Sequence, residues 1–291
     1  MMKIGVSSYS FHRLVASGAM SQLDVIAKAK EIGFDIIEFA TLHLPEGETP
    51  VSFAPRIRDE AARVGIEVGN YTIAADFLNH PGGLDGQIAA LGEELKAASL
   101  MGAPGMRHDA TWGLGANWHG PRAFDDVLPL LAKGCRAVTE QAVTMGIRTM
   151  VENHGYFAQD SARVEKLMNA VNHPNFGWLV DMGNFVCADE EPFKAVGIAA
   201  PYAFHVHAKD FHIKSGMLPD PGQGWFRSRG GNYLRGAIVG HGEVPVLQCL
   251  RLLKNAGYEG TVSLEFEGLE DPIQGITIGY ENLKRYIEMV G

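Results

Sequence analysis

The chain has 291 residues, 46% of them hydrophobic and 20% charged, so it can form one large domain or two small ones with a substantial core. Its formal net charge of −9 argues against a nucleic-acid partner, and no apolar run approaches the ~20 residues that a membrane helix needs. Cys135, Cys187 and Cys249 are far apart in the sequence and form no CxxC pair, which predicts reduced thiols in a cytoplasmic protein.

Short apolar strands alternate with segments of helical length along the whole chain. Strands are predicted near residues 3–8, 34–38, 66–71, 105–108, 146–151, 176–181, 202–207 and 261–265. Helices are predicted near residues 21–32, 52–64, 84–101, 122–145, 160–171, 190–198, 245–256 and 275–289. Several helical patterns end at a glycine, such as Gly65 or Gly146, where a left-handed C-cap would be needed.

Eight alternations of strand and helix predict parallel strands joined by right-handed crossovers. In a chain of this length that pattern is typical of the (β/α)₈ TIM barrel, here as a single domain over residues 1–291. A doubly wound open sheet is the alternative, but it would normally place a Gly-rich phosphate turn after the first strand, and residues 5–9 form no such turn. One connection, at about residues 211–242, is a long loop after the seventh strand, and loops of this length are usually functional or disordered.

Four consecutive predicted strands end in residues that can bind a metal. Strands five to eight end in Glu152, Asp181, His207 and Glu265. Active sites of this fold lie at the C-terminal strand ends, and neighbouring strands are ~4.8 Å apart, so the four side chains can surround one ion. Three carboxylates and one imidazole suit Mn²⁺ or Mg²⁺, tolerate Co²⁺, and differ from a closed thiolate zinc site. The sequence predicts one divalent metal ion, with Mn²⁺ preferred.

Each of these residues also has a purely structural interpretation. Glu152 could be solvated or paired with Arg148, and Asp181 could cap the turn that follows it. His205 and His207 share a strand face, and His207 is the better ligand because it lies nearer the strand end, which leaves His205 as a hydrogen-bonded histidine inside the barrel. The four-residue metal site is favoured because the barrel topology selects all four positions independently.

Five short motifs together resemble a known family. They are VENH at residues 151–154, VDMGN at 180–184, HVHAKD at 205–210, GHGEV at 240–244, and GYEG at 257–260 followed by Leu264 and Glu265. Their order and spacing resemble the sugar phosphate isomerase/epimerase superfamily, the xylose isomerase-like TIM barrels, over nearly the whole chain. The resemblance implies that the family's metal ligands fall on the same four strand-end residues named above.

The resemblance also implies a reaction. Members of this kind are isomerases or epimerases that act on a keto sugar, a sugar derivative or a keto-inositol through an enediolate, which the metal stabilises by chelating a carbonyl and a neighbouring hydroxyl oxygen. By resemblance, Glu152 and Glu265 remove and return the proton. Lys209 is expected to place its positive charge near the developing oxyanion.

The substrate-binding candidates are less specific than the metal ligands. They are His154, Asn184, His108, Glu38 and Trp112. His154 lies near the expected mouth of the barrel, Glu38 and His108 end strands two and four, and Trp112 could stack on a sugar face or pack a loop. Arg227, Arg229 and Arg235 in the long loop could clamp a phosphate or carboxylate, or could be solvated.

The sequence departs from ketose 3-epimerases at three positions. Asn184 stands where they carry a histidine, Ala158 where they carry an acid, and residues 211–214 lack the arginine found shortly after the strand-seven histidine. These departures disfavour a free-ketose 3-epimerase and leave another keto sugar, an inosose or a modified sugar.

Three other functions remain as alternatives. A metal-dependent lyase, resembling inosose dehydratases or eliminating from a keto-glycoside, would need the same metal and base. A DNA-repair enzyme resembling endonuclease IV would need more metal-binding histidines and a basic groove, which the net charge of −9 disfavours. A non-catalytic sugar- or metal-binding module is the third. The expected partner is a small-molecule sugar, without nucleic acid or membrane, and a homo-oligomer is compatible because barrels of this type often associate.

Overall fold

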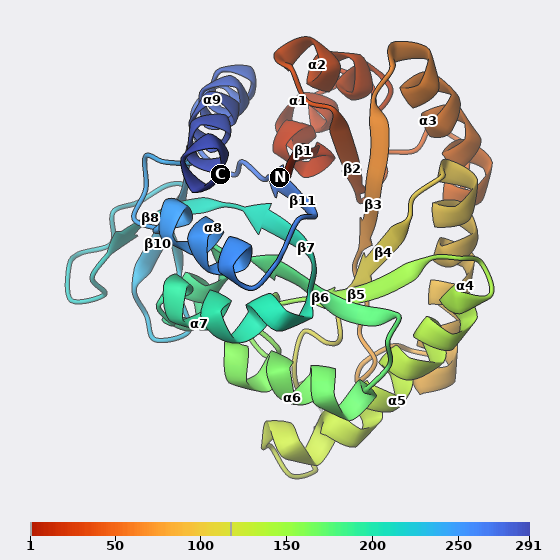
Figure 1. Cartoon of the computed structure of the whole chain (residues 1–291). Coiled ribbons are helices and arrows are strands. Elements are labelled where there is room, and N and C mark those ends of the chain that lie inside the picture. Colours follow the sequence, from red (N-terminus) through yellow and green to blue (C-terminus); the bar gives the residue numbers. More distant parts are fainter. Residues whose placement is uncertain (1, 117) are drawn as a thin grey trace.

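The computed structural model describes residues 2–116 and 118–291, and its centre is a closed barrel of parallel strands (Figure 1). Around the barrel the strand order is β1-β11-β7-β6-β5-β4-β3-β2. The strands are β1 (Lys3–Ser7), β2 (Ile36–Ala40), β3 (Glu67–Ile73), β4 (Gly105–His108), β5 (Arg148–Glu152), β6 (Phe176–Asp181), β7 (Ala203–Ala208) and β11 (Thr261–Leu264). The predicted (β/α)₈ barrel is therefore confirmed.

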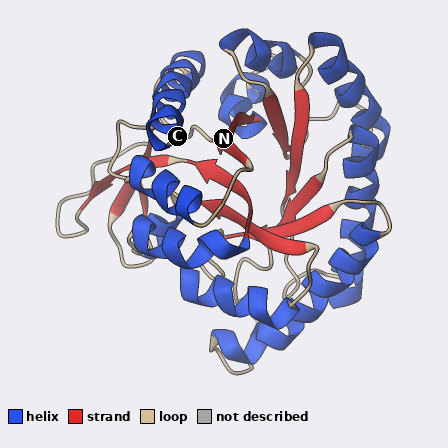
Figure 2. Cartoon of the chain, in the orientation of Figure 1, coloured by secondary structure: helices blue, strands red, loops and turns tan. Residues whose placement is uncertain are grey.

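Helices surround the strands as an outer layer (Figure 2). The main helices are α2 (Asp24–Ile32), α3 (Pro50–Val64), α4 (Gly83–Met101), α5 (Phe124–Val143), α6 (Ser161–Val171), α7 (Pro192–Ala199), α8 (Val246–Asn255) and α9 (Pro272–Val290). Each agrees within three residues with a predicted helix. The sequence pattern missed the short helices between β1 and α2, which are η1 (Ser8–Phe11) and α1 (His12–Ala16), and the short 3₁₀ helices η2 (Asn184–Ala188) and η3 (Ala200–Tyr202).

Local sequence signals explain where helix α3 begins and ends. The Thr49 side chain accepts a hydrogen bond from the Ser52 backbone N–H, and the Ser52 hydroxyl oxygen accepts one from the Thr49 N–H, which forms a capping box. Pro50 occupies the first turn, where no intrahelical N–H is needed. The helix ends at Gly65, whose φ of 73° is the left-handed conformation expected from the sequence.

The register of the parallel strands brings the polar strand ends to one level. Asp181 of β6 pairs with His207 of β7, and His207 in turn pairs with Ser263 of β11. Trp178, fully buried on β6, donates its indole N–H to the Asn153 side-chain oxygen at 3.1 Å. Asn153 also accepts from the Asp181 N–H and donates to the Asp181 carbonyl, so it fixes the ends of β5 and β6 together.

Residues 211–242, which the sequence predicts as a long loop, include most of a small antiparallel sheet. Its order is β8-β10-β9, and it projects from the barrel at the left of Figure 1. The strands are β8 (Asp210–Lys214), β9 (Phe226–Arg227) and β10 (Tyr233–Ala237). This segment is therefore ordered by backbone pairing and is not an irregular connection.

The buried Asp210 carboxylate joins this sheet to the barrel. Its two oxygens accept hydrogen bonds from the backbone N–H groups of Phe211, Gly240, Gly242 and Val244, at distances of 2.8–3.0 Å. Such a group of converging N–H donors favours an anion. The chain supplies that anion itself, at the point where β7 gives way to β8.

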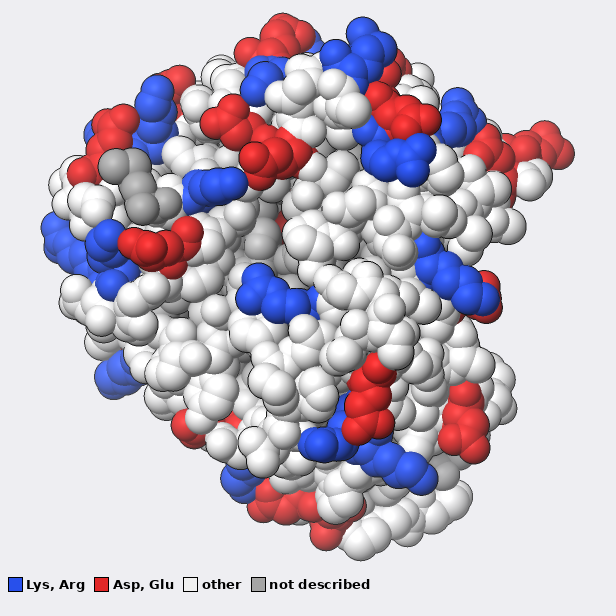
Figure 3. All heavy atoms as spheres, turned by 45° about the vertical axis from the view of Figure 1, so that its right-hand side comes forward, with Lys and Arg blue, Asp and Glu red and all other residues white. Residues whose placement is uncertain are grey.

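Charges of both signs are mixed on the face drawn in Figure 3, where Lys and Arg side chains lie among Asp and Glu side chains. This mixture differs from the basic stripe that is typical of nucleic-acid binding. Within residues 2–116 and 118–291, every helix is too short or too polar to cross a membrane.

Replacing Asp210 by Ala tests the role of this carboxylate. We expect Asp210→Ala to lower the free energy of unfolding by about 2–4 kcal/mol, because it leaves several buried N–H donors without an acceptor. Urea unfolding followed by circular dichroism measures the change. Asp220→Ala is the matched control, since exposed Asp220 accepts only the Gly222 N–H among the bonds of the described residues. Equal effects of the two substitutions would contradict this role.

Candidate metal centre and pocket

Four buried side chains converge at the C-terminal end of the barrel. Glu152, Asp181, His207 and Glu265 each offer a ligand atom, and these atoms all lie within 4.8 Å of one another. The Nδ1 atom of His207 is 3.8 Å from Glu152 Oε1, 3.6 Å from Asp181 Oδ2 and 3.5 Å from Glu265 Oε2. The four predicted metal ligands thus lie together, as the ends of β5, β6, β7 and β11 require.

Two atoms of this cluster lack the hydrogen bonds that buried polar atoms normally make. Asp181 Oδ2 and His207 Nδ1 are buried and make no hydrogen bond of good geometry, although Lys209 forms an ion pair with Oδ2 and the other Asp181 oxygen accepts from the N–H groups of Gly183 and Asn184. Leaving such atoms unpartnered is costly unless a ligand satisfies them. A donor set of carboxylate oxygens and one imidazole nitrogen fits a hard divalent cation.

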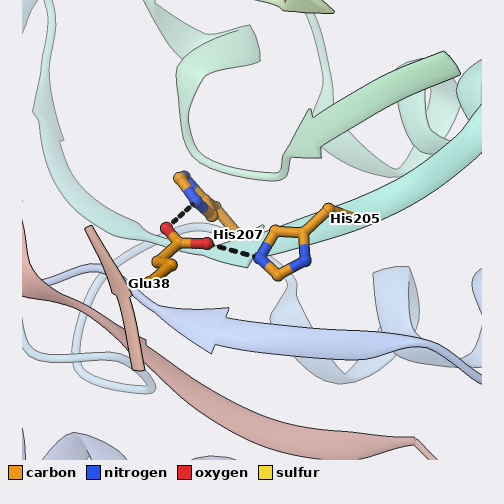
Figure 4. Close-up of side chains that lie close together, drawn as sticks. All are labelled: Glu38, His205 and His207. Carbon is orange, nitrogen blue, oxygen red and sulfur yellow. Dashed lines mark hydrogen bonds and ion pairs between the residues drawn. The ribbon is translucent and has the colours of Figure 1, made fainter. Parts of the chain in front are cut away.

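Glu38 holds the other side of the His207 ring. Its carboxylate contacts Nε2 of His207 at 2.5 Å and Nε2 of His205 at 2.6 Å, and it lies between the two rings in Figure 4. His205 also contacts the Ser263 hydroxyl at 3.0 Å. The predicted substrate ligand Glu38 therefore binds two imidazoles inside the barrel, and an Nε2–H bond to this carboxylate leaves Nδ1 of His207 to face the cluster.

The protonation of this buried group follows from its charges. Burial would raise the pKa of Glu38, but the attraction of His207 and His205 outweighs it and holds that pKa well below its usual range. Burial would lower the pKa of His207, but Glu38 and Glu265 raise it well above the usual value. Without a cation the imidazole is therefore charged, and binding of a cation at Nδ1 requires loss of that proton.

Lys209 supplies positive charge to the cluster. Its ammonium nitrogen lies 2.6 Å from Glu265, 3.0 Å from Asp181 and 3.1 Å from Glu267. Burial would lower the pKa of Lys209, but Asp181, Glu265 and Glu267 raise it well above its ordinary value. Lys209 is thus a permanently charged group beside two of the candidate ligands.

Arg107 and Asp109 are polar residues of the site that the sequence analysis did not select. The Arg107 guanidinium lies 2.7 Å from Glu152 and 2.8 Å from Asp109. Asp109 Oδ1 in turn lies 3.0 Å from Nδ1 of His154. The His154 ring packs edge-on against Trp112, with the ring centroids 4.9 Å apart. Side chains alternate between the two faces of a strand, so Arg107 and Asp109 lie on the face opposite to His108. This alternation could have identified them from the sequence.

The two glutamates differ in electrostatic environment. Burial raises the pKa of Glu152, and Arg107 and His207 offset this only in part. Burial acts in the same direction on Glu265, but Lys209 and His207 outweigh it and hold the pKa of Glu265 well below the usual range. Glu265 also accepts a hydrogen bond from the Ser7 hydroxyl at 3.0 Å.

A cavity of about 250 Å³ opens onto this cluster. It is lined by Tyr9, Ala40, Thr41, Thr72, Ile73, Ala74, Arg107, Asp109, Trp112, Glu152, His154, Lys209, Glu265 and Glu267. Of the predicted substrate ligands, His154 and Trp112 line it. Asn184 is buried behind it, where its amide donates to Glu152 at 2.8 Å and accepts from Lys209 at 3.2 Å. His108 is outside this lining, with its ring against Phe77 and Phe176.

The comparisons with known proteins agree with the fold. The model of the xylose isomerase-like TIM barrel family matches residues 26–286, so the chain belongs to this family, as the sequence motifs predicted. Among curated proteins, inosose dehydratase 1 of Bacillus cereus is 27% identical over 160 residues, which cover 49% of this chain and 47% of that protein. The chain therefore matches about half the length of this relative.

Two solved structures share the architecture over nearly their whole length. An L-ribulose 3-epimerase superposes with a TM-score of 0.74 at 16% identity, covering 100% of this chain and 96% of that one. A xylose isomerase-like TIM barrel protein from Mycobacterium smegmatis, solved in complex with magnesium, superposes with a TM-score of 0.71 at 16% identity, covering 100% and 97%. At these identities the likeness shows the fold.

Replacing Glu38 by Gln tests whether this carboxylate orients His207. We expect Glu38→Gln to weaken Mn²⁺ binding by roughly 10–100-fold, because it removes the charge that orients the ligand. Isothermal titration calorimetry measures the affinity. Glu94→Gln is the control, since Glu94 accepts from the Tyr71 hydroxyl away from the cluster. Unchanged affinity in folded Glu38→Gln would contradict the proposed positioning.

Adding metal should stabilise the fold. Mn²⁺ at 100 times its dissociation constant is expected to add about 2.7 kcal/mol to the free energy of unfolding, because only the folded chain assembles the four ligands. Thermal unfolding with and without Mn²⁺ measures the shift. Asp181→Asn keeps the oxygen that accepts from Gly183 but removes a charged ligand, so it should abolish most of the shift. A full shift in that variant would place the metal elsewhere.

Proposed function

We propose that this protein is a divalent-metal-dependent isomerase or epimerase of a keto sugar, a sugar derivative or a keto-inositol, acting through an enediolate. The observation that carries the proposal is the placement of Glu152 and Glu265 in one cavity, on either side of Asp181 and His207 in the strand order. Two carboxylates so placed can remove a proton from one position of a bound keto compound and return it at another.

The metal would be held by Glu152, Asp181, His207 and Glu265, and Mn²⁺ is the best candidate for this donor set. When bound, a divalent cation polarises a carbonyl oxygen and so acidifies the neighbouring C–H. The chain's own residues handle the proton. One of the two glutamates accepts it as the base, and the other donates one, to the opposite face for epimerisation or to the adjacent carbon for isomerisation.

Other residues of the cavity would orient the substrate and stabilise charge. The Lys209 ammonium lines the cavity and would stabilise, through its electric field and while still paired with Glu265, negative charge that develops on a substrate oxygen. His154 and Trp112 line the same cavity and can contact hydroxyl groups and an apolar sugar face. Asn184 contacts both Glu152 and Lys209 from behind, and so fixes the Glu152 carboxylate and the Lys209 ammonium relative to each other.

A lyase that eliminates water or an aglycone from the same kind of intermediate is the second candidate. The likeness of half the chain to an inosose dehydratase favours it. Both reactions begin with the removal of a proton next to a carbonyl, so they require the same base. We place the protein in the cytoplasm, because Cys135, Cys187 and Cys249 are all buried free thiols.

The two reactions can be separated by their products in D₂O. The Mn²⁺-loaded protein is incubated with a panel of ketohexoses and inososes, and the mixtures are followed by NMR. An isomerase or epimerase incorporates deuterium without loss of water or aglycone. Elimination products would instead support the lyase, and the absence of both exchange and elimination across the panel would contradict the enzymatic proposal.

Replacing Glu152 by Gln tests its proposed part in proton transfer. We expect Glu152→Gln to reduce the exchange rate by about 10²–10⁴-fold with the fold retained, because an amide can neither take up nor release the transferred proton as a carboxylate does. Glu140→Gln is the control, since Glu140 pairs with Arg136 on the surface of α5. An exchange rate equal to that of the control would refute the role of Glu152.

A further inference from the structure

The cationic side chains of the cavity are already paired with carboxylates. Among the described residues that line the cavity, Arg107 and Lys209 are the only Lys or Arg side chains. Arg107 contacts Asp109 and Glu152, and Lys209 contacts Glu265 and Glu267. Neither cation is available to an anionic substrate group without giving up a buried partner, which would leave that carboxylate unpaired.

The arginines of the segment after β7 do not supply the missing charge. Arg229 contacts Asp160 at 2.8 Å and also donates to the Tyr156 carbonyl. Arg227 donates to the Gly231 carbonyl at 3.0 Å and lies over the Tyr233 ring. Arg235 lies over the Trp225 ring, with its guanidinium 3.9 Å from Glu270. The phosphate clamp that the sequence allowed is therefore absent from the described lining of the cavity.

Two groups of backbone N–H donors near the strand ends already bind carboxylates of the same chain. The four N–H groups around Gly240 and Gly242 bind the Asp210 carboxylate. The N–H groups of Gly183 and Asn184 bind one oxygen of Asp181. Converging backbone N–H groups of this kind are what commonly bind phosphate, and in this chain carboxylates already occupy them.

The charge of the cavity remains unfavourable to anions when a metal is added. Its lining carries four carboxylates and two Lys or Arg side chains, and Asp181 lies directly behind them. A divalent cation leaves this set without a net positive charge, whether or not His154 is protonated. A phosphate ester or a sugar acid would have to place its charge among these carboxylates without a free Lys or Arg side chain to pair with it, which is unfavourable.

We propose that this cavity selects uncharged polyhydroxy-keto compounds, such as free keto sugars or keto-inositols, and discriminates against their phosphate esters and against sugar acids. The inference rests on the proposed function, because it names the substrate class of the same site. Hydroxyl groups are suited to this lining, since each can donate a hydrogen bond to one of the carboxylates without displacing an ion pair.

Matched pairs of compounds that differ by one phosphate group test the selectivity. The Mn²⁺-loaded protein is titrated with D-fructose and D-fructose 6-phosphate, and with dihydroxyacetone and its phosphate, and deuterium exchange is measured on the same four compounds. We expect at least one neutral member to bind at least tenfold more tightly than its ester. An ester that binds as tightly as its neutral partner, or no binding by either neutral compound, would overturn the inference.

Binding and exchange fail independently, so the two proposals can be told apart. Deuterium exchange on an ester as fast as on its neutral partner would refute the selectivity and leave the isomerase proposal standing. Tighter binding of the neutral compounds without any exchange would support the selectivity and count against the isomerase proposal.

A charge-neutralising pair of variants tests the physical cause. Glu267→Gln removes one carboxylate partner of Lys209 and should reduce the preference for the neutral compound several-fold. Glu67→Gln removes the same charge at the opposite end of the barrel, where Glu67 pairs with Lys3, and should leave the preference unchanged. An unchanged preference in Glu267→Gln, or an equal loss in both variants, would show that the charges lining the cavity do not set the selectivity.

Discussion

Repulsion among buried carboxylates is the constraint on which the rest of this structure depends. Glu152, Asp181 and Glu265 place oxygens around one imidazole with all four ligand atoms within 4.8 Å of one another. Burying several like charges this closely is unfavourable unless positive charge compensates them. Lys209, which pairs with Asp181, and the His207 ring provide part of that charge, and His207 Nδ1, which makes no hydrogen bond, leaves room for more. A divalent cation bound there would both compensate the charge of the carboxylates and give His207 Nδ1 a partner.

The barrel makes this arrangement rigid. Each ligand lies at the end of a different strand, and the strand register, rather than a flexible loop, fixes its height. Asn153 connects the ends of β5 and β6, Glu38 fixes the His207 ring, and Asn184 contacts Glu152 and Lys209. These contacts hold the side chains in fixed positions, as the proposed metal binding and proton transfer would require.

The sequence predicted the architecture and the four converging strand ends because both follow from periodicity and topology. Alternating strands and helices define the barrel, and the barrel alone brings residues 152, 181, 207 and 265 together. The residues that contact these four side chains could not be predicted in the same manner. Glu38 was expected to meet substrate but binds two histidines, and Arg107 was overlooked beside His108, because side-chain direction at a strand end depends on register and bulges. The strands within residues 211–242 were missed because β8 pairs with β10 across the intervening residues 215–232, so no tight hairpin turn marks the pairing in the sequence.

Anomalous diffraction from crystals soaked in manganese tests the central claim most directly, because it locates the cation without reference to activity. The account predicts one strong peak among Glu152, Asp181, His207 and Glu265. A structure with no peak there, or with the manganese bound elsewhere while Lys209 keeps its contacts to Asp181 and Glu265, would contradict it.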